Sequence, residues 1–129
     1  MSLPFPEGIF DKVVSITALE FIENGQAAVR ELFRVTKRGG RIVAATLNSL
    51  SPWAARRKGE ASKGHAIFQR AIFRTPEELC ALAPVGGQTR TAIHFRKEDN
   101  PAKAQEIEHD GREKDLDTGA FVAVRWEKA

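Results

Sequence analysis

Glu20 is the first side chain whose type and place suggest chemistry. It follows the apolar run Lys12–Thr17 by three residues, in a loop whose other residues are uncharged. A carboxylate at such a place can act as a general base or bind a cationic group of a substrate. The alternative is a solvated carboxylate near the amino terminus of the following helix, a position that by itself favours acidic residues.

A second group of candidate side chains follows the apolar run Arg41–Leu47. Asn48 comes directly after this run, and Trp53 follows Ser51-Pro52, a pair typical of a helix start. If the two runs are neighbouring parallel strands, their carboxyl ends lie at one rim of the sheet, where ligands bind in such folds. Trp53 at that rim would anchor a ligand, whereas packing of the short helix onto the domain explains this tryptophan equally well.

The remaining chemistry-bearing side chains form no recognisable pattern. His94 and His109 have no cysteine or carboxylate at ligand spacing, so no metal site is expected. His65 has no partner visible in the sequence, and Cys80 has no neighbouring base to activate its thiol. A single cysteine excludes an internal disulfide and agrees with a reducing, cytoplasmic location.

The two apolar runs and the stretch between them predict a strand, a crossover helix and a parallel strand. Both runs are rich in Val, Ile and Ala without alternation, which is typical of strands buried on both faces. The helix is expected to begin after Asn24, to bury one apolar stripe and to end at Gly39-Gly40. A capping box at Thr75–Glu78, with proline in the first turn, marks the start of a second helix.

The carboxyl-terminal part of the chain predicts two strands separated by a long connection. The strands are Gln88–Phe95 and Ala120–Trp126. The segment 97–118 between them is polar and net acidic, and is expected to be an insert or flexible connection. Within it, Ala102–Glu108 is expected to form a turn or two of helix, and Asp110-Gly111 a turn.

Several short segments follow one another in a characteristic order. They are Leu3–Gly8, Phe10-Asp11, Val13–Ser15, Ala18–Phe21, Arg34-Val35 and Arg38–Arg41. This order resembles the second half of a class I S-adenosylmethionine-dependent methyltransferase, in particular the ubiquinone-biosynthesis-like enzymes that act on small molecules. The resemblance implies a single α/β domain over residues 1–129. Its partial Rossmann-like sheet would have strands in the order four, five, seven, six, with helices on its faces and an antiparallel terminal hairpin.

The same resemblance implies methyl transfer from S-adenosylmethionine to a small-molecule acceptor. The residues implied to contact the donor are Thr17, Ala18 and Leu19. The residues implied to contact the acceptor are Phe21, Asn48 and Trp53. Glu20 would be the local proton acceptor, in a reaction that consists largely of holding the acceptor in line with the methyl group.

The donor-binding signatures of the family all precede Leu3–Gly8 in the family order, so the resemblance covers the carboxyl-terminal half only. Gly39-Gly40 and Gly86-Gly87 lack the strand and helix that flank a nucleotide-binding turn. We therefore expect the chain alone to be inactive and not to hold S-adenosylmethionine usefully. It would work with a donor-binding partner chain or form a homodimer. A non-catalytic, self-associating or partner-binding half-domain is the alternative.

Composition sets further bounds on function. The chain has 129 residues, which is long enough to bury one hydrophobic core. Its formal net charge is +3. It has no apolar run long enough to span a membrane and no secretory signal. The basic residues Arg56–Lys58, Lys63, Arg70 and Arg74 form a belt that a small nucleic-acid-binding protein would also show. No aromatic ladder accompanies this basic belt, so a solvated helix face is favoured over nucleic-acid binding.

Overall fold

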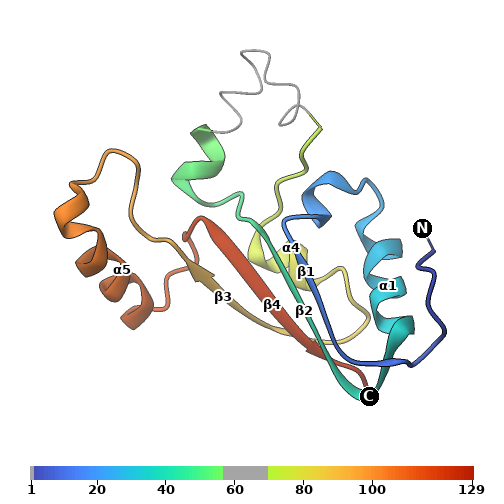
Figure 1. Ribbon diagram of the computed structural model, residues 1–129. Coiled ribbons are helices and arrows are strands. Elements are labelled where there is room, and N and C mark those ends of the chain that lie inside the picture. Colours follow the sequence, from blue (N-terminus) through green and yellow to red (C-terminus); the bar gives the residue numbers. More distant parts are fainter. Residues whose placement is uncertain (1, 57–69) are drawn as a thin grey trace.

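The computed structural model describes residues 2–56 and 70–129 and shows an α/β architecture (Figure 1). In chain order the elements are β1 (Phe10–Ile16), η1 (Leu19–Phe21), α1 (Gly25–Val35), β2 (Thr36–Leu47), α4 (Pro76–Cys80), β3 (Gln88–Ala92), η2 (Pro101–Lys103), α5 (Ala104–Glu113) and β4 (Phe121–Glu127). Residues 52–56 add a further turn of helix after β2, with the Ser51 hydroxyl accepting the amide of Ala54 at its start, as the Ser-Pro pair predicts.

The four strands form one mixed sheet in the order β1-β2-β4-β3. β1 and β2 are parallel, with Val14 opposite Val43, and α1 connects them. β4 lies antiparallel to both of its neighbours, β2 and β3. This is the predicted order four, five, seven, six, and the antiparallel pairing of the two terminal strands is confirmed.

The helix α1 begins where the sequence predicts and ends earlier. The Asn24 side chain accepts the amide of Ala27 at 3.0 Å, which confirms the N-cap. The helix stops at Val35, so the predicted end at Gly39-Gly40 is wrong. Residues after Val35 are extended because sheet partners take their hydrogen bonds: Thr36 pairs with Phe10, and the amide of Gly39 donates to the carbonyl of Lys128. Gly39, with a positive φ of 79°, therefore lies at an irregular position within β2 and does not cap the helix.

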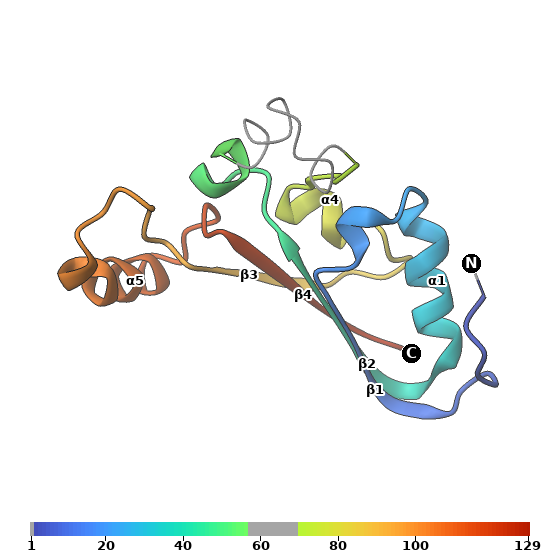
Figure 2. The same cartoon turned by 45° about the horizontal axis from the view of Figure 1, so that its top comes forward.

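The hydrophobic core lies on one face of the sheet. Figure 2 shows α1 and α4 on the same side of the strands, with α5 beyond the far end of β3. The buried core residues are Leu19, Ala28, Val29, Phe33, Ile42, Ala44, Leu79, Val122, Val124 and Trp126. The capping box of α4 is present in full, with Thr75 and Glu78 exchanging hydrogen bonds. Both helices thus contribute to the core, α1 through its apolar stripe and α4 through Leu79.

The opposite face of the sheet has no helix over it within the described residues. On β1 the side chains of Val14 and Ile16 are 60% and 64% exposed. The prediction that β1 is buried on both faces is therefore wrong for this part of the chain. The apolar composition of β1 is typical of a strand that is buried on both faces, but only the side chains on the α1 side are covered by the described residues.

The segment between β3 and β4 contains η2 and α5. The predicted turn at Asp110-Gly111 is wrong, because both residues lie inside α5. Gly111 packs against the ring of His94, and a Cβ atom at Gly111 would lie 2.2 Å from the His94 Cγ. The glycine therefore allows the helix to approach His94. In the sequence, a glycine needed for such close packing cannot be told from a glycine needed for a turn.

Candidate functional site

The candidate site is the rim at the carboxyl ends of β1 and β2. After β1 the chain turns at Thr17, whose φ of 49° is left-handed, and the Thr17 amide donates to the carbonyl of Ala45 at 2.8 Å. Thr17 and Ala18 are exposed, whereas Leu19 is buried in the core. Of the three residues implied to contact the donor, only Thr17 and Ala18 thus have exposed side chains.

Glu20 is fully buried, so the interpretation as a solvated carboxylate is wrong. Its Oε2 accepts the amide of Leu47 at 3.0 Å, and its carbonyl accepts the amide of Ile72 at 2.6 Å. Its Oε1 has no hydrogen-bond partner among the described residues. The carboxylate therefore ties the loop after β1 to the end of β2, and it does not face the solvent side of the rim.

The three residues implied to contact the acceptor differ in their surroundings. Phe21 is exposed beside Ala18. Asn48 is fully buried and donates through Nδ2 to the carbonyls of Asp117 and Gly119, at 2.7 and 2.9 Å. Asn48 therefore holds the loop before β4 and has no free donor to offer a ligand.

Trp53 packs against the body of the domain. Its indole nitrogen donates to the carbonyl of Phe95 at 2.8 Å, and the two rings meet edge to face with centroids 6.5 Å apart. These contacts support the packing interpretation of this tryptophan. Of the residues implied to contact the donor or the acceptor, Thr17, Ala18 and Phe21 are thus the exposed ones.

Arg74 is a site residue that the sequence analysis missed. The sequence predicts that Arg74 lies on a solvated basic belt, which is wrong, because the residue is only 8% exposed. Its Nη1 donates to the carbonyl of Leu19 at 2.9 Å, and its Nη2 lies 3.5 Å from the carbonyl of Ile22. No local signal reveals this role, because the acceptor Leu19 lies 55 positions away in the sequence.

The rest of the basic belt is partly exposed and partly outside the described residues. Arg56 and Arg70 are exposed, as expected of a solvated face. Arg57, Lys58 and Lys63 lie outside the described residues, as does the candidate His65. With Arg74 buried, the belt is smaller than its sequence suggests.

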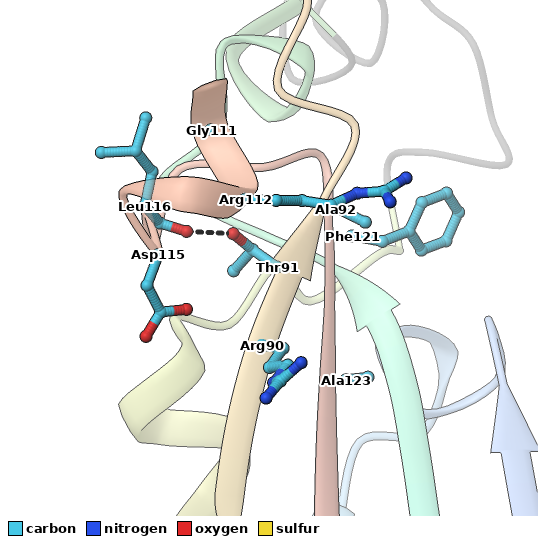
Figure 3. A pocket seen from close by; sticks show the side chains of 9 residues that line it. All are labelled: Arg90, Thr91, Ala92, Gly111, Arg112, Asp115, Leu116, Phe121 and Ala123. Atoms are coloured by element: carbon cyan, nitrogen blue, oxygen red, sulfur yellow. Dashed lines mark hydrogen bonds between the residues drawn. The ribbon is translucent and has the colours of Figure 1, made fainter. Parts of the chain in front are cut away.

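A cavity lies away from this rim. It has a volume of about 650 Å³ and opens between β3, β4 and the end of α5 (Figure 3). Its lining residues are Arg90, Thr91, Ala92, Gly111, Arg112, Asp115, Leu116, Phe121 and Ala123. The Thr91 hydroxyl donates to the carbonyl of Leu116 at its edge. No residue implied to contact donor or acceptor lines this cavity.

Two carboxylates outside the rim have lowered pKa values. The Arg34 side chain and the amide of Leu3 donate to Glu31 and lower its pKa from 4.5 to about 2. Burial raises the pKa of Glu108, but hydrogen bonds from the amides of His94 and Ile93 outweigh burial and lower it. Both carboxylates fasten one segment to another and lie apart from the rim.

Metal and donor sites can be judged for the residues that the structure covers. No cluster of three or more His, Cys, Asp or Glu side chains able to hold a metal ion occurs among them. Within residues 2–56 and 70–129, no strand leads through a glycine-rich turn into a helix. The described residues therefore contain no glycine-rich turn of the kind that holds a nucleoside. None of the described helices is both long and apolar enough to cross a membrane.

Comparison with known proteins finds methyltransferases that are similar to part of this chain. A family model described as a methyltransferase domain matches residues 1–44, which include β1 and α1. The demethylmenaquinone methyltransferase of Streptomyces griseus subsp. griseus is 49% identical over 43 residues, which cover 33% of this chain and 19% of that protein.

The fold is shared with solved structures over nearly the whole chain. An S-adenosylmethionine-dependent methyltransferase of Thermotoga maritima is similar with a TM-score of 0.77 at 19% identity, over 99% of this chain and 60% of the other. A similar chain comes from a complex between a methyltransferase and its activator from Haloferax volcanii, with a TM-score of 0.62 at 16% identity, over 96% and 56% of the two chains. The chain thus spans less than two thirds of the relatives that it matches. The chain is thus similar in fold to a large part of Rossmann-like S-adenosylmethionine-dependent methyltransferases, and similar in sequence to a methyltransferase domain over residues 1–44.

Proposed function

We propose that this chain forms the acceptor-side part of an S-adenosylmethionine-dependent methyltransferase that acts on a small molecule. The observation that carries the proposal is the rim after β1, where Thr17, Ala18 and Phe21 are exposed at the carboxyl end of a parallel strand. Ligands bind at this end of the strands in open α/β sheets. The similarity to a demethylmenaquinone methyltransferase, whose named substrate is a small molecule, supports the acceptor class.

The exposed residues of the rim would contact the ligands, and the buried residues would hold the loops. Thr17 and Ala18 would form a wall against the methionine end of the donor, and Phe21 would offer an apolar contact to the acceptor. Glu20 and Asn48 would hold these loops in place from beneath, because both are fully buried and bond to main-chain groups. Methyl transfer depends largely on alignment of acceptor and donor, so a rigid rim contributes directly to the rate.

The donor cradle is expected to come from a further polypeptide segment, on the same or on a partner chain. The chain matches only part of each relative, and its described residues supply one wall for the donor. We therefore infer that residues 1–129 alone are inactive. A half-buried free thiol, Cys80, suits the reducing cytoplasm that we infer for the protein.

Donor titration tests this proposal. Isothermal calorimetry with S-adenosylmethionine should give no binding in the micromolar range, since one wall cannot recover the whole affinity. At millimolar S-adenosylhomocysteine, NMR amide shifts should be confined to residues 17–21. Micromolar binding by the chain alone, or shifts located elsewhere, would contradict the proposed site.

A non-catalytic, self-associating half-domain is the second candidate, favoured by the exposed apolar side chains of Val14 and Ile16 on β1. A methyl-transfer assay separates the two functions. The chain is combined with the polypeptide encoded directly upstream, and incorporation from radiolabelled S-adenosylmethionine into small-molecule extracts is measured. Incorporation above that of either polypeptide alone supports the enzyme, whereas a stable dimer without incorporation supports the second function.

Nucleic-acid binding is not favoured. One of the belt cations, Arg74, is buried and bonded to carbonyl groups. Any interaction with DNA or RNA should be weak and vanish by about physiological salt, as non-specific phosphate contacts do. Sequence-selective submicromolar binding that survives this salt would overturn the methyltransferase proposal.

A further inference from the structure

Three buried polar side chains lie beneath the rim, and each bonds to the main chain of a distant segment. They are Glu20, Asn48 and Arg74. Glu20 holds the amide of Leu47, while Asn48 holds the carbonyls of Asp117 and Gly119. Arg74 differs from the other two, because it contacts the loop that carries the exposed rim residues.

The main chain around Arg74 joins both loops of the rim. Arg74 forms an isolated parallel bridge with Asn48, and its carbonyl accepts the amide of Ser49 at 2.9 Å. Two residues earlier, the amide of Ile72 donates to the carbonyl of Glu20 at 2.6 Å. The stretch 72–74 therefore crosses from the loop after β1 to the loop after β2.

The guanidinium group of Arg74 is packed closely between η1 and Gly25. It reaches the carbonyls of Leu19 and Ile22, on either side of η1. A Cβ atom at the buried residue Gly25 would lie 2.8 Å from the Arg74 Nη2. Burial of a guanidinium group costs free energy unless hydrogen-bond acceptors surround it. The carbonyls under η1 supply such acceptors, and in return the buried Arg74 side chain holds them in place.

The loop that Arg74 holds has few contacts of its own. It is a single 3-10 turn whose internal bonds run from the amides of Phe21 and Ile22 to the carbonyls of Ala18 and Leu19. One such turn is marginal by itself, and it follows a left-handed residue, Thr17. Its position therefore depends on bonds to other segments: the amides of Leu47 and Ile72 bond to Glu20, and Arg74 holds the carbonyls on either side of it.

We propose that Arg74 is a positioning residue for the methyl-transfer site. By holding the carbonyls of Leu19 and Ile22, it orients Thr17, Ala18 and Phe21 and joins the donor-side loop to the acceptor-side segment after β2. The role of these residues toward the donor rests on the function proposed above, whereas the holding of the loop stands on the geometry alone.

Amide hydrogen exchange tests the holding of the loop. In Arg74→Ala, exchange at Phe21 and Ile22 should rise at least about tenfold, since a hydrogen bond from a charged group is lost. Exchange at Val122, in the sheet core, should change much less. Millimolar ethylguanidinium should restore the protection by refilling the space, and Arg74→Lys should restore it in part. The matched control is Arg90→Ala on β3, an exposed arginine, which should leave the loop unchanged.

Donor-induced shifts test the functional part. Millimolar S-adenosylhomocysteine should shift the amides of residues 17–21 in the wild-type chain and in Arg90→Ala. The shifts should be lost in Arg74→Ala and return with ethylguanidinium, which a general loss of stability would not explain. A wild-type chain without these shifts would contradict the proposed function. Unchanged loop exchange in Arg74→Ala, or equal acceleration throughout the chain, would overturn the positioning role of Arg74.

Discussion

At the scale of single residues, the rim separates exposed side chains such as Thr17 and Phe21 from buried side chains that hold the backbone. Glu20 is the clearest case of the second kind, because its carboxylate is fully buried and accepts the amide of Leu47. A buried carboxylate that holds a main-chain amide makes the end of β2 and the loop after β1 one unit. The chemical character of Glu20 suggested a base, but its surroundings suit a fastening role.

Substitution of Glu20 distinguishes fastening from a surface role. Glu20→Ala should lower the free energy of unfolding by about 1–3 kcal/mol, because the buried amide of Leu47 loses its acceptor. Glu20→Gln keeps an oxygen for that amide and should cost less. Urea denaturation followed by circular dichroism measures both variants. If alanine and glutamine cost the same, or neither has an effect, the hydrogen bond to Leu47 does not stabilise the fold.

Glu31 links the amino-terminal segment to α1 in a pH-dependent way. Hydrogen bonds from Arg34 and from the amide of Leu3 lower its pKa from 4.5 to about 2. Since the folded pKa lies below the unfolded one, its contribution is fully present above pH 4.5 and is lost as the pH falls toward 2. The difference in unfolding free energy between wild type and Glu31→Gln should therefore shrink across this window.

The matched control for Glu31 is Glu23→Gln, an exposed carboxylate just before α1. Urea denaturation at pH values from 2 to 6 should show little change with pH in the difference between Glu23→Gln and wild type. A Glu31→Gln difference that stays constant across the same range would show that the carboxylate is not held by Arg34 and Leu3 in solution.

At the scale of elements, close packing explains a glycine that looked like a turn signal. Gly111 lies inside α5, where a Cβ atom would meet the ring of His94 at 2.2 Å. Gly111→Ala should therefore lower the free energy of unfolding by about 1–3 kcal/mol through overpacking. In Gly86→Ala the added methyl group has nothing within 4 Å, so the effect should stay within about 0.5 kcal/mol.

Thermal unfolding of the two glycine variants measures this difference. Loss of α5 packing should also change the NMR signals of the His94 ring in Gly111→Ala and leave them unchanged in Gly86→Ala. Equal stability of both variants, with an unchanged His94 ring, would show that α5 does not pack on His94 as described.

At the scale of the whole molecule, the sheet ends in an apolar edge. Among the described strands, β1 pairs only with β2, and its side chains Val14 and Ile16 remain exposed. Unpaired strand edges are templates for pairing with another chain, and closed two-fold dimers are the commonest arrangement of identical chains. We therefore expect residues 1–129 to self-associate through β1 when no further segment covers it.

A charge on this edge should weaken the association. Ile16→Lys places an ammonium group beside the free edge of β1, so light scattering over a dilution series should show dissociation at higher protein concentration than for wild type. Leu116→Lys, at another exposed apolar side chain after α5, is the control and should associate like wild type. A monodisperse monomer at all concentrations, or equal behaviour of the two variants, would contradict a dimer through β1.

The amino-acid sequence by itself determined the features that depend on neighbouring residues. The N-cap at Asn24 and the capping box at Thr75–Glu78 are confirmed, because each cap bonds to an amide within three residues. The apolar stripe predicted the helix α1, and the apolar composition of the strands predicted the elements of the sheet. The order of the strands came from the resemblance to a family, whose fold repeats that order.

Only the tertiary structure decided which polar groups are buried. The partners of Glu20, Asn48 and Arg74 lie 27, 71 and 55 positions away, so no local pattern marks these side chains as internal. The end of α1 at Val35 depends likewise on sheet partners at Phe10 and Lys128. Burial and helix ends are settled by competition between distant main-chain groups, and that competition exists only once the chain has folded.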